Sequence, residues 1–315
     1  MNNSQKMSVG IIGIGMVGRE LARYFQEMRG YERGKDLYLY DIDPKKSYSD
    51  DVMKGEVIFV CVPTPRSHDG SCNTTAVESV VASFKEPRIV VIKSTVPPGT
   101  TEELQKKHPQ HKLLFNPEFL TESQAWHDMV RPDRQIVGFT ALSKDAAGPV
   151  LSLLSHAPFM SPWGSGYQRH QLSATEAEIA KNYGNAFFSV KVIFANIIAS
   201  SCEALGKKQG ENSIEDPVVN YENVRMALAA DYRIGASHLN VYHDGYRGFG
   251  GYCLPKDLDS LITFLDSLGV DSSLLKSART YNHALLVSQG LTQDRVSSHG
   301  FNHDNGSSTD PVEKG

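Results

Sequence analysis

A glycine-rich turn between a hydrophobic strand and a helix constrains this chain more than any other sequence feature. The turn reads Gly13-Ile14-Gly15-Met16-Val17-Gly18; it follows the apolar run Ser8–Ile12 and opens a helical segment. Glycines at these spacings allow a tight turn and a close backbone approach, while the helix N-terminus offers unpaired N–H groups to a pyrophosphate. The pattern therefore predicts a dinucleotide-binding turn at the start of an α/β domain.

An acidic residue supports this interpretation. Asp41 ends the second predicted strand, where a carboxylate can accept hydrogen bonds from both hydroxyls of a ribose. Because a 2′-phosphate would face a like charge there, NAD is favoured over NADP, although Lys46 lies close enough in sequence to reach a phosphate or the ribose. The alternative interpretation is a tight packing turn beside a surface aspartate.

The first half of the chain alternates short hydrophobic runs with helical stretches, which predicts a Rossmann-like, doubly wound parallel sheet in an α/β domain. The predicted strands are Ser8–Ile12, Leu37–Tyr40, Val57–Val62, Arg88–Ile92, Lys112–Phe115 and Gln135–Val137. From Ser173 the pattern changes to a long helical stretch, Ala174–Leu205, with Gly206 at the position of a C-cap. We predict an NAD-binding domain over residues 1–170, an all-helical domain with a long central helix over 171–290, and a disordered tail over 291–315.

The composition narrows the class of partner. With 32 Lys and Arg against 36 Asp and Glu, the 315-residue chain has a formal net charge of −4, so it has no basic field for nucleic acid or an anionic membrane. Its start lacks the apolar stretch of a signal peptide, and its apolar runs fall short of the ~20 residues that span a bilayer. Four cysteines without a CxxC pair fit neither a disulfide framework nor a metal cluster. These features predict a cytoplasmic protein with reduced thiols and no metal.

Three further predicted strands end in polar loops, and ligands of open α/β sheets bind at the carboxyl ends of the strands. The loops carry hydroxyls, a stiffening proline and two carboxylates: Thr64, Ser94, Thr95, Pro65, Glu118 and Glu122. The topology brings all three loops to one edge of the sheet, so they are candidates for cofactor and substrate contacts. Taken singly, each loop is also explained as a rigid turn, and each glutamate as a complement to a helix dipole.

The long helix carries Glu178, Lys181 and Asn185 on one face, at positions i, i+3 and i+7. A lysine and an asparagine one turn apart can both donate to an oxygen that gains negative charge during a reaction. Spacing alone favours a solvated Glu178–Lys181 pair beside a polar asparagine. The catalytic interpretation therefore requires a partner site.

The loop Gly248–Asp257 supplies that partner site. Its three glycines in four residues let the backbone approach a ligand, and Pro255 marks the first turn of a helix. Cys253 would then lie near a helix N-terminus and the cation of Lys256, both of which stabilise a thiolate. The remaining cysteines are expected to be small buried hydrophobes: Cys61, Cys72 and Cys202.

In combination these motifs resemble those of the UDP-glucose/GDP-mannose dehydrogenase family, the nucleotide-sugar 6-dehydrogenases. The matching segments, in family order, are Gly13–Gly18, Val62–Pro65, Lys93–Thr100, Asn116–Glu122, Pro132–Arg134, Lys181–Asn185, Arg233–Gly235 and Gly248–Asp257. The resemblance implies a four-electron oxidation of the C6 alcohol of a nucleotide sugar to a carboxylate, with NAD as the cofactor. The segment Tyr252–Asp257 is most similar to that of UDP-glucose enzymes, and a homodimer built on the long helix is implied as well.

The resemblance also implies a role for each matching residue. Cys253 would form a thiohemiacetal and then a thioester with the substrate, while Lys181 and Asn185 would stabilise an oxyanion. Thr95 and Asp257 would hold a water, and Glu118 would act as acid and base. Cofactor contacts are implied for Gly13, Ile14, Gly15, Met16, Val17, Gly18, Asp41, Lys46, Thr64, Pro65, Ser94, Thr95, Glu122 and Lys256. Substrate contacts are implied for Glu118, Phe119, Leu120, Lys181, Asn185, Gly248, Phe249 and Gly250, and for Arg233 of a neighbouring protomer.

The sequence departs from the family pattern in three places. Family members usually carry Gly where Ser123 stands and often Arg or Ala at Thr121, and they have a third domain that binds the nucleotide. The chain ends before such a domain, as a fragment or a natural short form, so it is expected to bind the nucleotide half of its substrate weakly. Two alternatives remain: a two-domain β-hydroxyacid dehydrogenase, which transfers one hydride and needs no nucleophilic cysteine, and an NAD-binding protein without catalytic activity.

Overall fold

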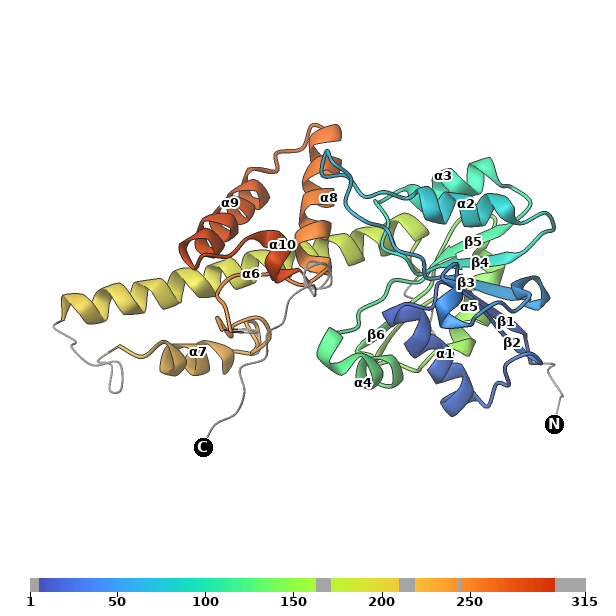
Figure 1. Cartoon of the computed structure of the whole chain (residues 1–315), viewed down its shortest axis with the longest axis horizontal. Helices are drawn as coiled ribbons and strands as arrows, with labels where there is room; N and C mark the ends of the chain where they lie inside the picture. Colours follow the sequence, from blue (N-terminus) through green and yellow to red (C-terminus); the bar gives the residue numbers. More distant parts are fainter. Residues whose placement is uncertain (1–5, 163–170, 210–218, 243–244, 298–315) are drawn as a thin grey trace. The chain divides into compact units, whose positions relative to one another are not determined.

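The computed structural model describes residues 6–162, 171–209, 219–242 and 245–297. The chain divides into two compact units, one formed by residues 1–68 and 72–182 and the other by residues 69–71 and 183–315 (Figure 1). The division falls inside helix α6 (Ala174–Lys208), which begins in the first unit and continues through the second.

The first unit contains a six-stranded sheet in the order β2-β1-β3-β4-β5-β7. Its strands are β1 (Val9–Ile12), β2 (Leu37–Tyr40), β3 (Val57–Val60), β4 (Ile89–Ile92), β5 (Lys112–Phe115) and β7 (Gly138–Phe139). The first five run parallel, and β7 pairs antiparallel with β5. The predicted Rossmann-like, doubly wound fold is confirmed.

The last predicted strand, Gln135–Val137, is not part of this sheet. The strand found there, β6 (Arg134–Ile136), pairs with β8 (Phe159–Ser161) in a separate two-stranded sheet. The free edge of β5 is instead taken by β7, two residues further along the chain. A run of β-forming residues identifies a strand but not its partner, so this part of the prediction was wrong.

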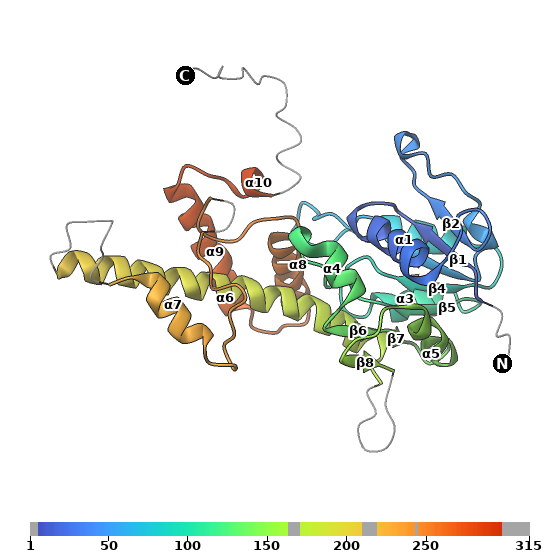
Figure 2. The same ribbon diagram turned by 90° about the horizontal axis from the view of Figure 1, so that it is seen from below.

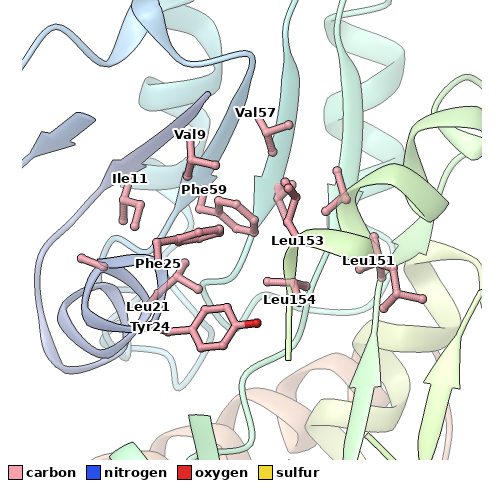
Figure 3. Close-up of a cluster of buried hydrophobic side chains, with 14 of the residues drawn as sticks. Val9, Ile11, Leu21, Tyr24, Phe25, Val57, Phe59, Leu151, Leu153 and Leu154 are labelled. Atoms are coloured by element: carbon pink, nitrogen blue, oxygen red, sulfur yellow. The ribbon is translucent and has the colours of Figure 1, made fainter. Parts of the chain in front are cut away.

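Helices cover both faces of the main sheet. They are α1 (Met16–Arg29), α2 (Thr75–Ser83), α3 (Thr100–Lys107), α4 (Ala125–Val130) and α5 (Lys144–Leu153). Alternate residues of one strand enter different clusters: Val57 and Phe59 pack with α1 and α5, whereas Ile58 and Val60 pack with α2 and α3. Figure 3 shows the first cluster, with Phe25 of α1 beside Phe59. Burial on both faces explains why these strands are continuous hydrophobic runs.

In the second unit, α7 (Tyr221–Ala229), α8 (Cys253–Ser267), α9 (Ser273–Ser288) and α10 (Gln293–Val296) accompany α6 (Figure 2). One cluster joins α6 to α8 and α9 through residues such as Ile193, Leu261 and Ala278. The long helix is as predicted, but Gly206 is not its C-cap, because the N–H of Gln209 still bonds the carbonyl of Leu205. Ordered structure also continues past residue 290: α10 lies in the predicted disordered tail, while residues 298–315 lie outside the described part of the chain.

Candidate functional site

The turn between β1 and α1 has the geometry that a pyrophosphate requires. Gly13 has φ +91°, and a Cβ on it would lie 2.7 Å from the carbonyl oxygen of Cys61. A Cβ on Gly18 would lie 2.0 Å from the carbonyl oxygen of Gly13. At Gly15, the N-cap of α1, a Cβ would meet nothing within 4 Å, and in the described part of the chain no side chain caps this helix. The first turn of α1 therefore keeps its N–H groups available on an open side.

Asp41 lies beside this turn, as predicted. Its Oδ2 accepts from the N–H of Ile14 at 2.7 Å and from Lys46 Nζ at 2.8 Å, and its Oδ1 accepts from the N–H of Asp43 at 2.9 Å. Burial alone would raise the pKa of Asp41, but the hydrogen bonds from Lys46, Asp43 and Ile14 hold that pKa below its usual value. The carboxylate is thus ionised and fixed next to the phosphate-binding turn, so these residues fit a dinucleotide with a free ribose 2′-hydroxyl.

The hydroxyls predicted at the carboxyl edge of the sheet bind neighbouring loops. Thr64 Oγ1 donates to the carbonyl of Thr95 at 2.8 Å, and Ser94 Oγ donates to the carbonyl of Val62 at 2.7 Å. Their oxygens keep lone pairs that can accept a further hydrogen bond. Pro65 follows in the same loop, whereas Glu122 begins an exposed 3₁₀ turn (Glu122–Gln124).

A buried ion pair connects the loop after β5 to α6. Lys181 Nζ lies 3.8 Å from Glu118 Oε2, with 5% and 7% of the two side chains exposed. The N–H of Leu120 donates to Glu118 Oε1. The ring of Phe119 lies 3.9 Å from the Arg134 guanidinium and 5.6 Å from Lys181 Nζ. The structure therefore brings together Glu118, Phe119 and Lys181, three of the predicted site residues.

The solvated Glu178–Lys181 pair, which spacing alone favours, is not formed. Glu178 has no exposed surface, and its carboxylate accepts from the backbone of Gly99 and from Thr101. Lys181 pairs instead with Glu118. Spacing along one helix cannot reveal that another segment covers that face, which is why this interpretation was wrong.

A second buried hydrogen-bond network lies close to Glu118, and the sequence analysis did not predict it. Lys93 Nζ donates to Asn116 Oδ1 at 2.8 Å, and Asn116 Nδ2 donates to Gln135 Oε1 at 3.0 Å and to the Ile136 carbonyl at 2.6 Å. Burial lowers the pKa of Lys93. The network connects the ends of β4 and β5 to β6, and its sequence signals were a lysine and an asparagine, each placed directly after a buried strand.

In the second unit, Cys253 is the first residue of α8, a helix of 15 residues. One turn later, Asp257 accepts from Asn185 Nδ2 at 2.6 Å and from Lys256 Nζ at 2.5 Å, and only 1% of Asp257 is exposed. The predicted residues Asn185, Lys256 and Asp257 therefore form one buried cluster. The N-terminus of α8 stabilises negative charge on a nearby thiol.

The glycine loop before Cys253 is held by an asparagine that the sequence did not reveal. Asn282 of α9 accepts from the N–H of Phe249 at 2.8 Å and donates to its carbonyl at 2.9 Å. Gly248 has φ +107°, and a Cβ on Gly250 would lie 2.6 Å from the carbonyl oxygen of Val296. The glycines are thus required by the close packing of this loop against α9 and α10.

The remaining predicted residues are more scattered. Arg233 is paired with Asp231 at 2.6 Å, and 74% of its side chain is exposed. Of the three cysteines expected to be buried, Cys202 is buried, whereas Cys61 and Cys72 are half-buried. Burial of its thiol group raises the pKa of Cys61 to about 12, so that thiol stays protonated. Among the described residues, no group of three or more His, Cys, Asp or Glu side chains could hold a metal ion.

Comparison with known proteins adds the chemistry of relatives. The NAD binding domain of the UDP-glucose/GDP-mannose dehydrogenase family matches residues 40–151, and the central domain of the same family matches residues 175–284. A UDP-glucose 6-dehydrogenase of Pseudomonas aeruginosa is 32% identical over an alignment that covers 88% of this chain and 65% of that protein. A UDP-glucose 6-dehydrogenase of Bacillus subtilis is also 32% identical, over 78% of this chain and 53% of that protein.

A solved structure has the same fold. The UDP-glucose dehydrogenase of the hyperthermophilic archaeon Pyrobaculum islandicum superposes with a TM-score of 0.71 at 24% identity, over 92% of this chain and 72% of that one. The chain thus spans 65% and 53% of the lengths of the two curated relatives named above.

Proposed function

Since this chain belongs to the UDP-glucose/GDP-mannose dehydrogenase family, with NAD as its cofactor, we propose that it oxidises the C6 alcohol of a nucleotide sugar to a carboxylate. The observation that carries the proposal is the cluster at the start of α8, where Cys253 is followed one turn later by an aspartate that Asn185 and Lys256 hold in place. A single oxidation to an aldehyde needs no such nucleophile.

The cofactor would be held by residues of the first unit. Gly13, Gly15 and Gly18 leave the first turn of α1 open to a pyrophosphate, and Asp41 offers acceptors to a ribose. When bound, NAD⁺ accepts one hydride in each of the two oxidations. We propose further contacts from Ile14, Met16 and Val17 in the turn, from Lys46, from Thr64, Pro65, Ser94, Thr95 and Glu122 in the loops, and from Lys256.

In the proposed reaction, the Cys253 sulfur attacks the carbonyl carbon of the intermediate aldehyde and forms a thiohemiacetal. Loss of a hydride from that carbon, with loss of the hydroxyl proton, gives a thioester. Water then adds to the thioester carbonyl, the C–S bond breaks, and the carboxylate and the Cys253 thiol are released. The N-terminus of α8 favours the thiolate both as attacking and as leaving group.

Charges and hydrogen bonds for these steps would come from two buried groups of residues, the Glu118–Lys181 pair and the cluster around Asp257. Lys181 and Asn185, one turn apart on α6, would donate to the oxyanion of each tetrahedral intermediate. Glu118 would take the proton from the attacking water, which Thr95 and Asp257 would orient. Phe119, Leu120 and the loop Gly248–Gly250 would contact the sugar nucleotide, and so would Arg233 of a neighbouring protomer. The proposal requires both clusters to act on one substrate.

The decisive assay counts NADH formed per sugar consumed, using the 315-residue chain with NAD⁺ and UDP-glucose, GDP-mannose or UDP-N-acetyl sugars. Two NADH per sugar are expected, with UDP-glucose as the preferred substrate. One NADH would indicate a single-step dehydrogenase of the β-hydroxyacid type. NAD binding without turnover of any sugar would indicate an NAD-binding protein without catalytic activity.

We also propose that the chain forms a homodimer whose interface is built on α6. Among the described residues, α6 is long and apolar enough to cross a membrane by length and composition alone. Its exposed aromatic and aliphatic side chains recur at helical spacing: Tyr183, Phe187, Phe194, Ile197 and Leu205. Other positions of the same helix carry polar groups that bond within the second unit: Asn185, Lys191 and Asn196. A helix with polar groups at these positions is better covered on its apolar side by a second copy of the chain than by lipid.

The dimer is tested by light scattering after size-exclusion chromatography without detergent. Phe194, with 61% of its surface exposed, is replaced by glutamate, and Lys207→Glu near the end of the same helix is the control. The wild type and the control should elute as dimers and Phe194→Glu as a monomer. A monomeric wild type at micromolar concentration would refute the proposed dimer.

A further inference from the structure

Glu178 is a buried carboxylate for which the proposed reaction has no use. It lies on α6, three residues before Lys181, and none of its surface is exposed. Its Oε2 accepts from the N–H of Gly99 at 2.6 Å, and its Oε1 accepts from the N–H and the hydroxyl of Thr101 at 2.9 and 2.6 Å. All the acceptor directions it uses point to one short segment of chain.

That segment is the start of α3, which cannot cap itself. Gly99 is the N-cap of α3, has φ +95° and has no side chain to accept from the first N–H groups of the helix. Glu178 therefore supplies from α6 the acceptor atoms that the first N–H groups of α3 lack. The free-energy cost of burying a carboxyl group here is reduced only because these donors are fixed in place.

Asn182, one turn further along α6, holds the other end of the same loop. Its Nδ2 donates to the carbonyl of Val96 at 2.9 Å, and Asn182 is 1% exposed. Two successive turns of α6 thus bind both ends of the segment Val96–Thr101. Thr95, which orients the attacking water in the proposed function, immediately precedes this segment, and its carbonyl accepts a hydrogen bond from Thr64 Oγ1 at 2.8 Å.

The same two turns of α6 carry Lys181, which pairs with Glu118. We propose that Glu178 and Asn182 are positioning residues, which keep Thr95 at a constant place relative to Lys181 and Glu118. This inference rests on the proposed function for the roles of Thr95 and Glu118. The contacts themselves lie entirely within the first unit of the structure.

The test replaces Glu178 by glutamine, whose size is the same but whose amide group cannot accept from both Gly99 and Thr101. Glu176→Gln is the matched control, because Glu176 is an exposed carboxylate on the same helix that accepts from Ser173. Hydrogen exchange of peptides spanning residues 94–104 and the steady-state kinetics of NADH formation are measured for both. Thr101→Val, which removes one hydroxyl donor, is a milder second variant in case Glu178→Gln does not fold.

For Glu178→Gln we expect exchange across Val96–Thr101 to be at least tenfold faster, kcat to fall at least tenfold, and KM for NAD⁺ to change less than twofold. Thr101→Val should change the same quantities in the same direction, and Glu176→Gln should change none of them. Unchanged exchange in both test variants would overturn the proposal. Faster exchange with unchanged kcat would also overturn it, because the contacts would then stabilise the loop without positioning Thr95.

The kinetic and exchange arms separate this proposal from the proposed function. A wild type that forms no NADH with any nucleotide sugar refutes the function, and with it the catalytic meaning of the positioning. The exchange arm still decides whether Glu178 holds the segment Val96–Thr101.

Discussion

Replacement of Asp41 by asparagine is expected to weaken binding of NAD about 10²-fold. A carboxylate has about four acceptor positions, and Ile14, Asp43 and Lys46 occupy three of them. The Lys46 side chain is 39% exposed and can move to solvent, which leaves two positions for the two hydroxyls of a ribose. Hydrogen bonds to a charged group contribute about 1.5–3 kcal/mol each. Asparagine keeps one acceptor, loses its charge, and turns an N–H group toward the second hydroxyl.

The loss of one charged hydrogen bond and the weakening of the other amount to about 3 kcal/mol, which is about 10² in the dissociation constant. Titration of NADH binding by fluorescence at fixed ionic strength measures this change. Asp43→Asn is the matched control, because it removes the same charge two residues away, from a half-buried side chain that caps a 3₁₀ turn (Pro44–Lys46). The control should bind within threefold of the wild type.

A folded Asp41→Asn protein that binds NADH within threefold of the wild type would refute the reasoning. The thermal midpoint, followed by circular dichroism, verifies that each variant is folded. With NADPH in place of NADH, Asp41→Asn should bind the cofactor more tightly than the wild type does. The 2′-phosphate is repelled by the wild-type carboxylate and not by the amide, so the ratio of the NADPH and NADH dissociation constants should fall in Asp41→Asn.

Three further predictions concern other parts of the molecule. Gly18→Ala should lower the free energy of unfolding in urea by at least about 3 kcal/mol, because the added Cβ would lie 2.0 Å from the Gly13 carbonyl; a loss below about 1 kcal/mol would contradict the packing. Cys253→Ala should abolish formation of the acid, as measured by chromatography of the sugar product, and an unchanged yield of acid would exclude the covalent mechanism. Burial raises the pKa of Glu178 to about 7 from 4.5, so its stabilising contribution is full below pH 4.5 and is lost as the pH rises through 7. The free energy of unfolding in urea of Glu178→Gln, taken relative to the wild type, should therefore rise by up to about 3 kcal/mol from pH 4.5 to pH 8. A difference between the two proteins that does not change with pH would contradict the raised pKa.

The sequence predicts best those features whose cause is local. The turn Gly13–Gly18 and Asp41 lie within one β-α-β unit, so the spacing of the glycines and the position of the acid specify their geometry. The long helix follows from its unbroken pattern in the same way. The glycine loop and Pro255 also predicted a helix that begins close to Cys253, and α8 begins at Cys253 itself.

Features that depend on a distant segment were missed or misjudged. Glu178 reads as a solvated partner of Lys181 because nothing in its own helix reveals the start of α3 packed against it. Asn282 lies 33 residues from Phe249, and no local pattern connects the two. The partner of β6 was misjudged for the same reason, since β8 lies more than twenty residues away along the chain.

The polar face of α6 connects these observations. Glu178, Lys181, Asn182 and Asn185 are spaced i, i+3, i+4 and i+7, and all four are at most 8% exposed. Burying four polar groups on one face of a helix is unfavourable unless each is bonded. Each binds a different segment: the start of α3, Glu118 after β5, the carbonyl of Val96, and Asp257 in α8. Apolar residues of similar size would stabilise this helix at least as well. The face is therefore better explained by the positioning of the segments that it binds than by stability.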